Sequence, residues 1–184
     1  MAAIISSEIL FKYSVKTGSA GNTTVGTANG SLGKWISTTT MPDATLNGLF
    51  DNISGAENAA STVDYRCVFV HNSNSANALE NAVVYLSAET AGGASIAIAV
   101  DTTAASALGA GTDQALTATN ETAPGTGVTS LSYSSPTTSG AGLALGNIPA
   151  GSVKAFWVRR SASNSAALSS DGVTFAVTGD TGSL

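Results

Sequence analysis

The feature that most constrains this chain is an alternation of side chains with a period of two. In residues 9–16 (ILFKYSVK), every odd position is apolar and most even positions are polar. This is the pattern of a β-strand with one buried face. Similar alternation recurs at residues 96–100, 153–158 and 173–177, and more weakly at 115–119. The pattern predicts an all-β protein.

Two further runs, residues 65–71 and 82–86, are apolar at both odd and even positions. We expect residues 65–71 to form a central strand covered on both faces. The polar stretch 72–77 between the runs predicts a hairpin or a pair of strands that crosses between sheets. The connecting segments are dense in Gly, Asn, Ser and Asp, which favours turns. We therefore predict an antiparallel β-sandwich, jelly-roll or Ig-like, with long Gly/Ser/Thr-rich loops.

One segment departs from the two-residue period. In residues 42–53, the apolar side chains from Leu46 onward recur at i, i+3, i+4 and i+7. This spacing predicts either one or two helical turns or an irregular loop that packs a small core of its own. No other segment favours a helix, so we expect at most one short helix.

The length of 184 residues fits a single domain over residues 1–184, with residues 1–16 as an N-terminal arm or edge strand. A chain of this size buries enough surface to fold without a metal or a disulfide. Cys67 is the only cysteine, so an intrachain disulfide is excluded. The Gly/Ser/Thr-rich stretches 17–31 and 121–142 are expected to be loops rather than linkers.

Charged residues make up only 10% of the chain, and the formal net charge is −5. The seven Lys and Arg are scattered, so no basic patch predicts nucleic-acid binding. No stretch approaches the roughly 18 apolar residues of a membrane span. The first residues lack the basic region and apolar core of a signal peptide, so we expect synthesis in a cytoplasm and no membrane partner.

The sequence contains few residues that could carry out nucleophilic catalysis. His71 is the only histidine, and Cys67 precedes it by four positions in the same predicted strand. Residues four apart in a strand are about 13 Å apart, which is too far for a Cys–His hydrogen bond. We interpret Cys67 as a small buried hydrophobic residue and His71 as a strand-end residue at the surface or an interface.

Three carboxylates, Asp51, Glu57 and Asp64, lie close together in the sequence. Their spacing matches no catalytic motif, so we interpret them as solvated loop carboxylates rather than as an acid–base pair. The loop 51–57 is rich in oxygen ligands, but Ile53 and Gly55 break the EF-hand pattern, which leaves a loop calcium site as a minor alternative. Asp64-Tyr65-Arg66 is interpreted as ordinary surface charge. We predict no catalytic residue, cofactor or metal.

Aromatic side chains offer one alternative function. Trp35 and Tyr133, if exposed on a concave face, would suit a carbohydrate-binding module. Trp157 shares a strand face with Val153 and Ala155, which favours burial in the core.

Several segments resemble a group of tailed-bacteriophage virion structural proteins encoded among head and tail genes. They are residues 32–37 (LGKWIS), 43–46 (DATL), 49–51 (LFD), 57–60 (ENAA), 63–68 (VDYRCV), 148–153 (IPAGSV), 157–160 (WVRR) and 173–177 (VTFAV). The resemblance is to head decoration (cement) proteins. It implies a non-enzymatic virion protein on the capsid surface that stabilises the capsid by bridging neighbouring capsomers.

The partners implied by this resemblance are the major capsid protein and copies of the chain itself, as a homo-oligomer and by analogy a trimer. As candidate interface residues we take Phe11, Tyr13, Trp35, His71, Arg159 and Arg160. We also expect the strand Glu8–Lys16 to add to a neighbour's sheet edge, so that deleting residues 2–16 abolishes assembly but leaves a soluble core. The alternatives are a tail, neck or fibre component and a carbohydrate-binding module.

Overall fold

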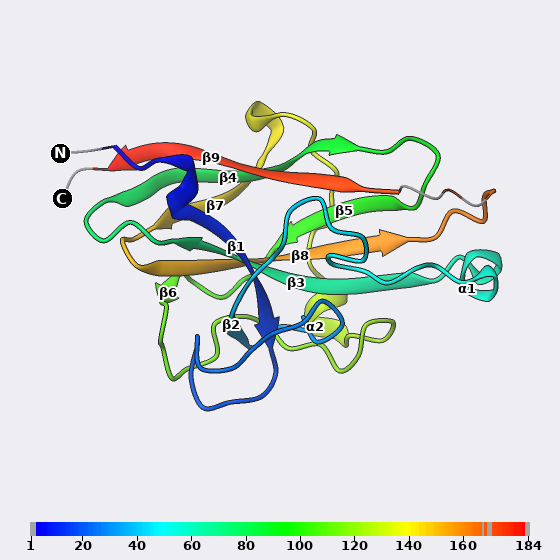
Figure 1. Cartoon of the computed structure of the whole chain (residues 1–184), viewed down its shortest axis with the longest axis horizontal. Helices are drawn as coiled ribbons and strands as arrows, with labels where there is room; N and C mark the ends of the chain where they lie inside the picture. The colour runs from blue at the N-terminus through cyan, green and yellow to red at the C-terminus, as the bar shows by residue number, and fades with distance from the viewer. Residues whose placement is uncertain (1–2, 167, 169–170, 183–184) are drawn as a thin grey trace.

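The computed structural model describes residues 3–166, 168 and 171–182 (Figure 1). Its strands are β1 (Ile9–Val15), β2 (Trp35–Thr40), β3 (Val63–Asn72), β4 (Ala78–Glu89), β5 (Ser95–Val100), β6 (Ser106–Ala107), β7 (Leu143–Ile148), β8 (Ser152–Ser161) and β9 (Val173–Gly182). Its helical segments are the 3₁₀ turns η1 (Ser6–Glu8) and η2 (Ser139–Ala141) and the short α-helices α1 (Gly55–Ala60) and α2 (Thr126–Thr129). None of the described helices is long and apolar enough to cross a membrane.

The strands form two antiparallel sheets. The larger sheet has the order β2-β1-β3-β8-β5, with β6 also paired to β8, and the smaller sheet has the order β7-β4-β9. The predicted all-β sandwich is therefore confirmed. The two long apolar runs occupy β3 and β4, which belong to different sheets, so they form the sheet-crossing pair rather than the hairpin.

The larger sheet lies between two apolar cores, and Figure 1 shows the smaller sheet on one side of it and loops with α2 on the other. The inner core fills the space between the sheets and includes Val68, Val70, Val84 and Phe156. The outer core is covered by loop residues instead of strands. Its buried members are Ile36, Tyr65, Cys67, Phe69, Ala115, Ala118, Val128, Val153, Ala155 and Trp157.

Strand β3 is the centre of this arrangement. Val68 and Val70 enter the inner core, whereas Cys67 and Phe69 enter the outer core, and all four are fully buried. The absence of period-two alternation at residues 65–71 thus reflects burial on both faces, as predicted. Trp157, on the neighbouring strand β8, is also fully buried, as its strand face indicated.

The loop layer approaches the larger sheet closely at one glycine. Gly33 has a φ of +89° and forms an isolated bridge to Thr117. A Cβ atom at this position would overlap the Leu116 carbonyl oxygen. The predicted strand at 115–119 is wrong: this segment is a loop with an isolated bridge at Thr117, and its buried residues Ala115 and Ala118 are three positions apart rather than two.

Of the two alternatives predicted for residues 42–53, the structure shows the irregular loop and not the helical turns. This segment is an irregular loop in which Leu49 is buried, whereas Leu46 is 76% exposed. The helix α1 begins later, where Ser54 and Glu57 form a reciprocal capping box: the Glu57 backbone N–H donates to Ser54 Oγ, and the Ser54 N–H donates to Glu57 Oε2 at 2.7 Å. With α2 there are two short α-helices among the described residues, one more than expected.

The N-terminal strand does not lie at an edge. β1 pairs with β2 on one side and with β3 on the other, with Leu10 opposite His71 and Phe11 opposite Val70. The expectation of an edge strand within residues 1–16 is therefore wrong. Because β1 is an internal strand, its removal would break two ladders of the larger sheet.

The edges of the two sheets differ. The outer edge of β2 is covered by residues 22–26, where the Thr38 N–H donates to the Thr24 carbonyl at 2.9 Å. The outer edge of β5 is covered by residues 134–135, where Ile98 and Ser134 exchange backbone hydrogen bonds of 2.8 and 3.0 Å. In the smaller sheet, β7 and β9 are the end strands.

Candidate functional site

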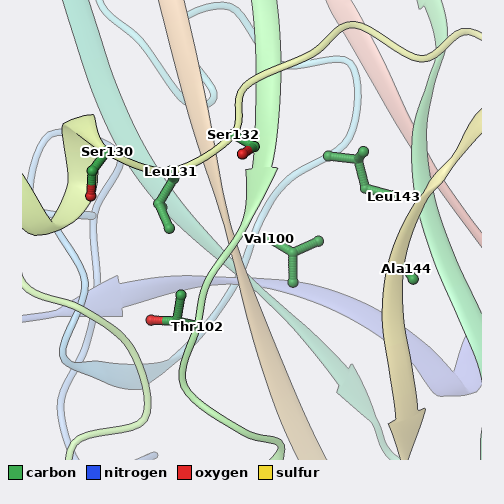
Figure 2. Close-up of a pocket in the computed structure, with 7 residues that line it drawn as sticks. All are labelled: Val100, Thr102, Ser130, Leu131, Ser132, Leu143 and Ala144. Carbon is green, nitrogen blue, oxygen red and sulfur yellow. The ribbon is translucent and has the colours of Figure 1, made fainter.

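The larger of two surface depressions is a cleft of about 370 Å³ between the end of β5 and the start of β7. Figure 2 shows its lining, in which apolar side chains alternate with hydroxyls. The lining residues are Val100, Thr102, Ser130, Leu131, Ser132, Leu143 and Ala144. None of these side chains is a general acid or base near neutral pH, so this cleft lacks the convergent ionisable groups that catalysis needs.

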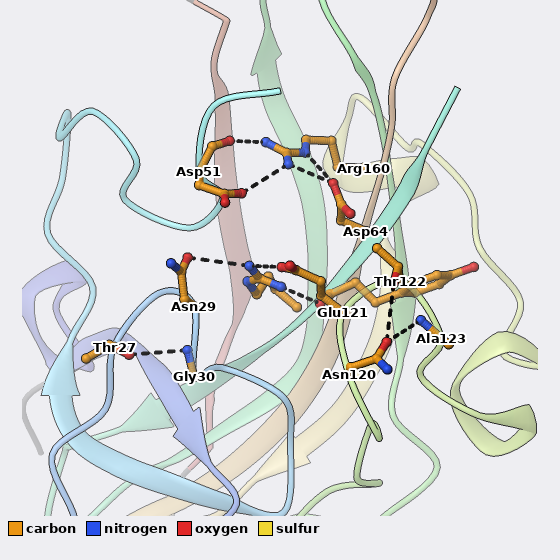
Figure 3. Close-up of polar contacts among 12 residues, drawn as sticks. Thr27, Asn29, Gly30, Asp51, Asp64, Asn120, Glu121, Thr122, Ala123 and Arg160 are labelled. Carbon is orange, nitrogen blue, oxygen red and sulfur yellow. Dashed lines mark hydrogen bonds and ion pairs between the residues drawn. The ribbon is translucent and has the colours of Figure 1, made fainter. Parts of the chain in front are cut away.

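A cluster of charged side chains lies at one end of the inner core, where β3 and β8 extend beyond the smaller sheet. Arg160 donates to Asp64 Oδ2 from Nε at 3.1 Å and from Nη2 at 2.7 Å. It also donates from Nη1 to the Asp51 carbonyl and approaches the Asp51 carboxylate at 3.4 Å. Figure 3 shows this guanidinium between the two acids. The pairing holds the loop that carries Asp51 against the sheet.

Arg66 forms the second half of the cluster and is fully buried. Its guanidinium makes an ion pair with Glu121 and donates to the Tyr65 carbonyl at 3.2 Å. It also approaches Asn29 Oδ1 at 3.5 Å (Figure 3). Arg66 and Arg160 both pack on the ring of Phe50, with guanidinium carbons 5.4 and 4.6 Å from its centroid.

Short polar turns place the partners of Arg66. The Asn120 side chain accepts from the Ala123 N–H at 2.6 Å, which shapes the loop that carries Glu121. The Thr27 hydroxyl accepts from the Gly30 N–H at 3.2 Å, which shapes the loop that carries Asn29 (Figure 3). The cluster therefore joins loops that are far apart in the sequence to the end of β3.

These contacts correct the predictions for the acidic residues. Asp64 and Arg66 are buried, so the interpretation as ordinary surface charge is wrong. Asp64 is not a solvated loop carboxylate, because it binds Arg160 within the fold. Asp51 does lie in a loop with its side chain 51% exposed, as predicted, and its carboxylate approaches Arg160 at 3.4 Å. Glu57 caps α1, and its hydrogen bonds with Ser54 lower its pKa. Among the described residues, no group of three or more acidic, Cys or His side chains lies close enough to hold a metal ion.

A second buried polar network centres on Asp101, which the sequence analysis did not single out. Its Oδ2 accepts from Trp157 Nε1 at 2.8 Å and from the Leu116 N–H at 2.9 Å. Its Oδ1 accepts from the Thr103 N–H at 2.7 Å, and its carbonyl accepts from Lys154 Nζ at 2.7 Å. Burial lowers the pKa of Lys154, and the Asp101 charge opposes this effect. The network joins the loop layer to β8.

The potential nucleophile and base lie within the larger sheet. Cys67 is fully buried, and burial raises the pKa of its thiol well above the usual value, with a further contribution from the Asp101 charge. His71 is also buried, so its prediction as a surface residue is wrong. Burial and the Lys12 charge lower the His71 pKa. The two residues pair with Trp157 and Val153 of β8, four positions apart, as expected.

The aromatic residues form no exposed platform. Trp35 is buried, and its Nε1 donates to the Thr112 carbonyl at 3.2 Å. Tyr133 is half-buried between Tyr65, at a centroid distance of 5.7 Å, and the Arg159 guanidinium. The two aromatic residues proposed for sugar binding thus pack against other residues of the same chain.

The six candidate interface residues have little free surface. Tyr13, Trp35, His71 and Arg160 are buried, and Phe11 and Arg159 are half-buried. All contribute to internal packing: Phe11, for example, makes an edge contact with Phe156 at 6.2 Å. Strand alternation identified aromatic and basic residues but did not show that both faces of the larger sheet are covered.

The exterior carries no fully exposed cation. All seven Lys and Arg are buried or half-buried. The exposed charged residues are Asp43, Asp51, Glu89, Asp113, Asp171 and Asp180, and Lys16, Lys34 and Arg159 are half-buried. The outer surface is therefore made of small, hydroxyl, amide and acidic side chains.

The second depression adjoins the outer edge of β9. This groove of about 200 Å³ is formed by the N-terminal segment, Leu79 and the last part of β9; its lining residues are Ile4, Ile5, Ser6, Ile9, Leu79, Val177, Thr178, Gly179 and Thr181. Ile5 is 59% exposed, which makes it one of only four large apolar side chains with high exposure in the described chain. Ile5 thus lies in the N-terminal segment that lines this groove beside β9, where the Ile4 N–H donates to Thr181 Oγ1 at 3.1 Å.

Comparison with protein-family models, with curated proteins and with solved structures finds no match to this chain.

Proposed function

We propose that this protein is a non-enzymatic structural component of a tailed-phage virion, and specifically a decoration protein that bridges neighbouring capsomers on the outer capsid. The observation that carries the proposal is where the ionisable side chains lie. The cations are buried or half-buried, and the buried acids Asp64 and Asp101 are hydrogen-bonded inside the fold. The cleft between the end of β5 and the start of β7 has no acid or base for catalysis near neutral pH. This distribution supports a structural role better than a catalytic one.

The exterior suits a protein that is surrounded by neighbours. Small and hydroxyl side chains lose little rotamer entropy when a contact forms. Few ions have to be desolvated on such a surface, and desolvating ions is the main cost of a charged interface. Since its exposed charges are all acidic, we expect the complementary capsid surface to be neutral or basic.

The phage assignment rests on the resemblance of residues 32–68 and 148–177 to virion structural proteins. A tail, neck or fibre component would share the same physical properties and differs only in its place in the particle. We do not propose a carbohydrate-binding module, because Trp35 is buried and Tyr133 packs against Arg159.

Cryo-EM of virions that carry this chain tests the proposal directly. We expect density for the two-sheet sandwich on the outer capsid at junctions between capsomers. Particles that lack the chain should lose integrity at a lower temperature, and adding the purified protein should restore their stability. Density confined to the tail or neck, or no density in the particle, would overturn the decoration role.

A further inference from the structure

The sequence contains two Asn-Gly dipeptides, Asn29-Gly30 and Asn47-Gly48, and both asparagines lie in exposed turns. In such a dipeptide the backbone nitrogen of the glycine can attack the side-chain amide carbon of the asparagine and close a five-membered succinimide ring. Glycine hinders this attack least, because it has no Cβ atom. Since the two dipeptides share this local chemistry, the structure around each one decides how readily it reacts.

The side-chain oxygen of Asn29 faces a buried cation. Its Oδ1 lies 3.5 Å from Nη2 of Arg66, which is fully buried (Figure 3). Attack on the amide carbon places negative charge on this oxygen, and a guanidinium directed at the oxygen stabilises that charge. No described residue donates a hydrogen bond to the Asn47 side chain. The surroundings of Asn29 therefore favour ring closure more than those of Asn47.

The two attacking nitrogens also differ in how firmly they are held. Gly30 is exposed, and its N–H donates to the Thr27 hydroxyl at 3.2 Å, a side-chain partner that water can replace. Gly48 is half-buried, and its N–H donates to the Thr45 carbonyl at 3.0 Å. The Gly48 carbonyl also accepts from the hydroxyl of Tyr13, a residue of the inner core. The turn at Gly48 is thus anchored on both sides of its nitrogen.

We propose that Asn29 is a site of spontaneous deamidation, and that the aspartate it yields pairs with the buried guanidinium of Arg66. The Gly30 nitrogen loses its proton to water and forms a bond to Cγ of Asn29. The bond from Cγ to the amide nitrogen breaks, and ammonia leaves. Water then opens the succinimide to aspartate or isoaspartate. The net reaction consumes water and releases ammonia, so it requires no enzyme, metal or oxidant.

The charge balance around Arg66 favours the aspartate product. Its described carboxylate partner is Glu121, whose side chain is 39% exposed, and its Nε has no hydrogen-bond partner among the described residues. A second guanidinium, that of Arg160, packs on the same Phe50 ring. A carboxylate at position 29 would turn the long amide contact into a charge-assisted hydrogen bond, which is shorter and roughly twice as strong. We therefore expect the modified protein to be the more stable form.

Deamidation rates at the two asparagines test the first half of the proposal. Incubation near physiological pH and temperature, followed by peptide mapping with mass spectrometry, measures both rates in the same sample. The same incubation in guanidinium chloride removes the fold and gives the effect of sequence alone. In the folded protein Asn29 should react at least about fivefold faster than Asn47, a difference of about 1 kcal/mol in activation free energy. In denaturant the two rates should agree within about twofold.

The variant Gly30→Ala identifies the attacking nitrogen. A Cβ atom at this position would lie 3.1 Å from the Thr27 hydroxyl oxygen at the end of a short side chain, so the fold should accept it. The added methyl group hinders ring closure and should slow the reaction at Asn29 at least about tenfold, with the rate at Asn47 unchanged. Equal or slower reaction at Asn29 than at Asn47 in the folded wild-type protein would overturn the proposal.

The variant Asn29→Asp supplies the product directly and tests the pairing with Arg66. It should raise the melting temperature by about 2 °C, whereas Asn47→Asp, which adds the same charge to the other turn, should change it by less than about 1 °C. The gain should be lost as the pH falls below about 4, because pairing lowers the folded pKa of the new carboxylate below its unfolded value.

The loss of the gain at low pH separates an ion pair from a change in turn preference, which would not depend on pH. An Asn29→Asp protein that melts no higher than Asn47→Asp, or a gain that persists at low pH, would overturn the pairing. These measurements use the free protein, so their outcome does not depend on the proposed virion role.

Discussion

The larger and the smaller sheet differ in how completely the chain covers them. The larger sheet has an apolar core on each face and loops along both outer edges. The smaller sheet has one core, a solvent-facing outer surface and two end strands, β7 and β9. Full coverage buries many polar side chains in the larger sheet, whereas the smaller sheet depends mainly on apolar packing. Three buried nitrogens of the larger sheet have no hydrogen-bond partner among the described residues: His71 Nδ1 and the Nε atoms of Arg66 and Arg159.

The buried charged residues follow this difference between the sheets. Arg66, Arg160, Lys154 and Asp101 all lie in or against the larger sheet. A buried ion pair contributes little net stability, but removing one partner leaves an uncompensated charge and is costly. The larger sheet should therefore be sensitive to single polar substitutions, and the smaller sheet should tolerate them.

Arg160→Met should produce the largest loss. It leaves Asp64 buried without its partner and should lower the free energy of unfolding by about 3–5 kcal/mol. Urea unfolding measures the change. The double variant Arg160→Met/Asp64→Leu removes both charges and should recover part of the loss, whereas Glu80→Gln in the smaller sheet should change stability by less than about 0.5 kcal/mol. Equal losses in Arg160→Met and Glu80→Gln would contradict the comparison.

The two tryptophans give a second test within the covered face of the larger sheet. Trp157→Phe removes the donor to the Asp101 carboxylate and leaves a small cavity, so it should cost about 2–4 kcal/mol. Trp35→Phe removes a 3.2 Å hydrogen bond to the loop carbonyl of Thr112 and should cost about 1 kcal/mol. Chemical denaturation of both variants measures the two losses. If Trp35→Phe were the more damaging change, the Asp101 network would not be the main anchor of the loop layer.

The strands whose sequences alternate clearly could be predicted. β1, β5, β8 and β9 follow the two-residue period, and β3 shows burial on both faces. β2 was missed because Ser and Thr dominate its second half, and β7 because Gly146 interrupts it. Period-two patterns report which face of a strand is buried, but they do not report what covers the other face.

The polar clusters could not be predicted for a related reason. Arg66 binds Glu121 and approaches Asn29, and both partners come from loops whose positions depend on the whole fold. Nothing local distinguishes Arg66 from a solvated arginine. The one usable signal was its position within the otherwise apolar run 65–71. The order of the strands in the two sheets was likewise hidden, because sheet order cannot be read from alternation.

His71, in β3 of the larger sheet, should make the stability of the protein depend on pH. Its folded pKa is lowered by burial and by Lys12, and its Nδ1 has no hydrogen-bond partner among the described residues. The unfolded state therefore binds the proton first, and stability should fall as the pH drops below about 6.5 toward the folded pKa.

The expected slope is at most that of one proton, about 1.4 kcal/mol per pH unit. Unfolding of wild type and of His71→Gln between pH 7 and pH 5 isolates this effect, since the variant should lose the dependence in this range. The lowered carboxylate pKa values of Glu8 and Glu57 act below pH 4.5 in both proteins. Parallel profiles for the two proteins would show that His71 does not control stability here.

The smallest effect is expected on the exposed face of the smaller sheet, where Glu80 and Asp180 lie directly opposite each other on β4 and β9. Like charges in this position repel, so Asp180→Asn should stabilise the protein by about 0.3 kcal/mol at low salt. The asparagine oxygen can still accept from Asn81 Nδ2, which donates to Asp180 at 3.2 Å, so the variant changes the charge and keeps the contact.

Because both side chains are accessible to solvent, salt should remove the difference between Asp180→Asn and wild type. Thermal unfolding of the two proteins at low and high salt measures this convergence. A stability change above about 1 kcal/mol, or one that high salt leaves unchanged, would mean that Asp180 is buried against a neighbour under the conditions of the measurement.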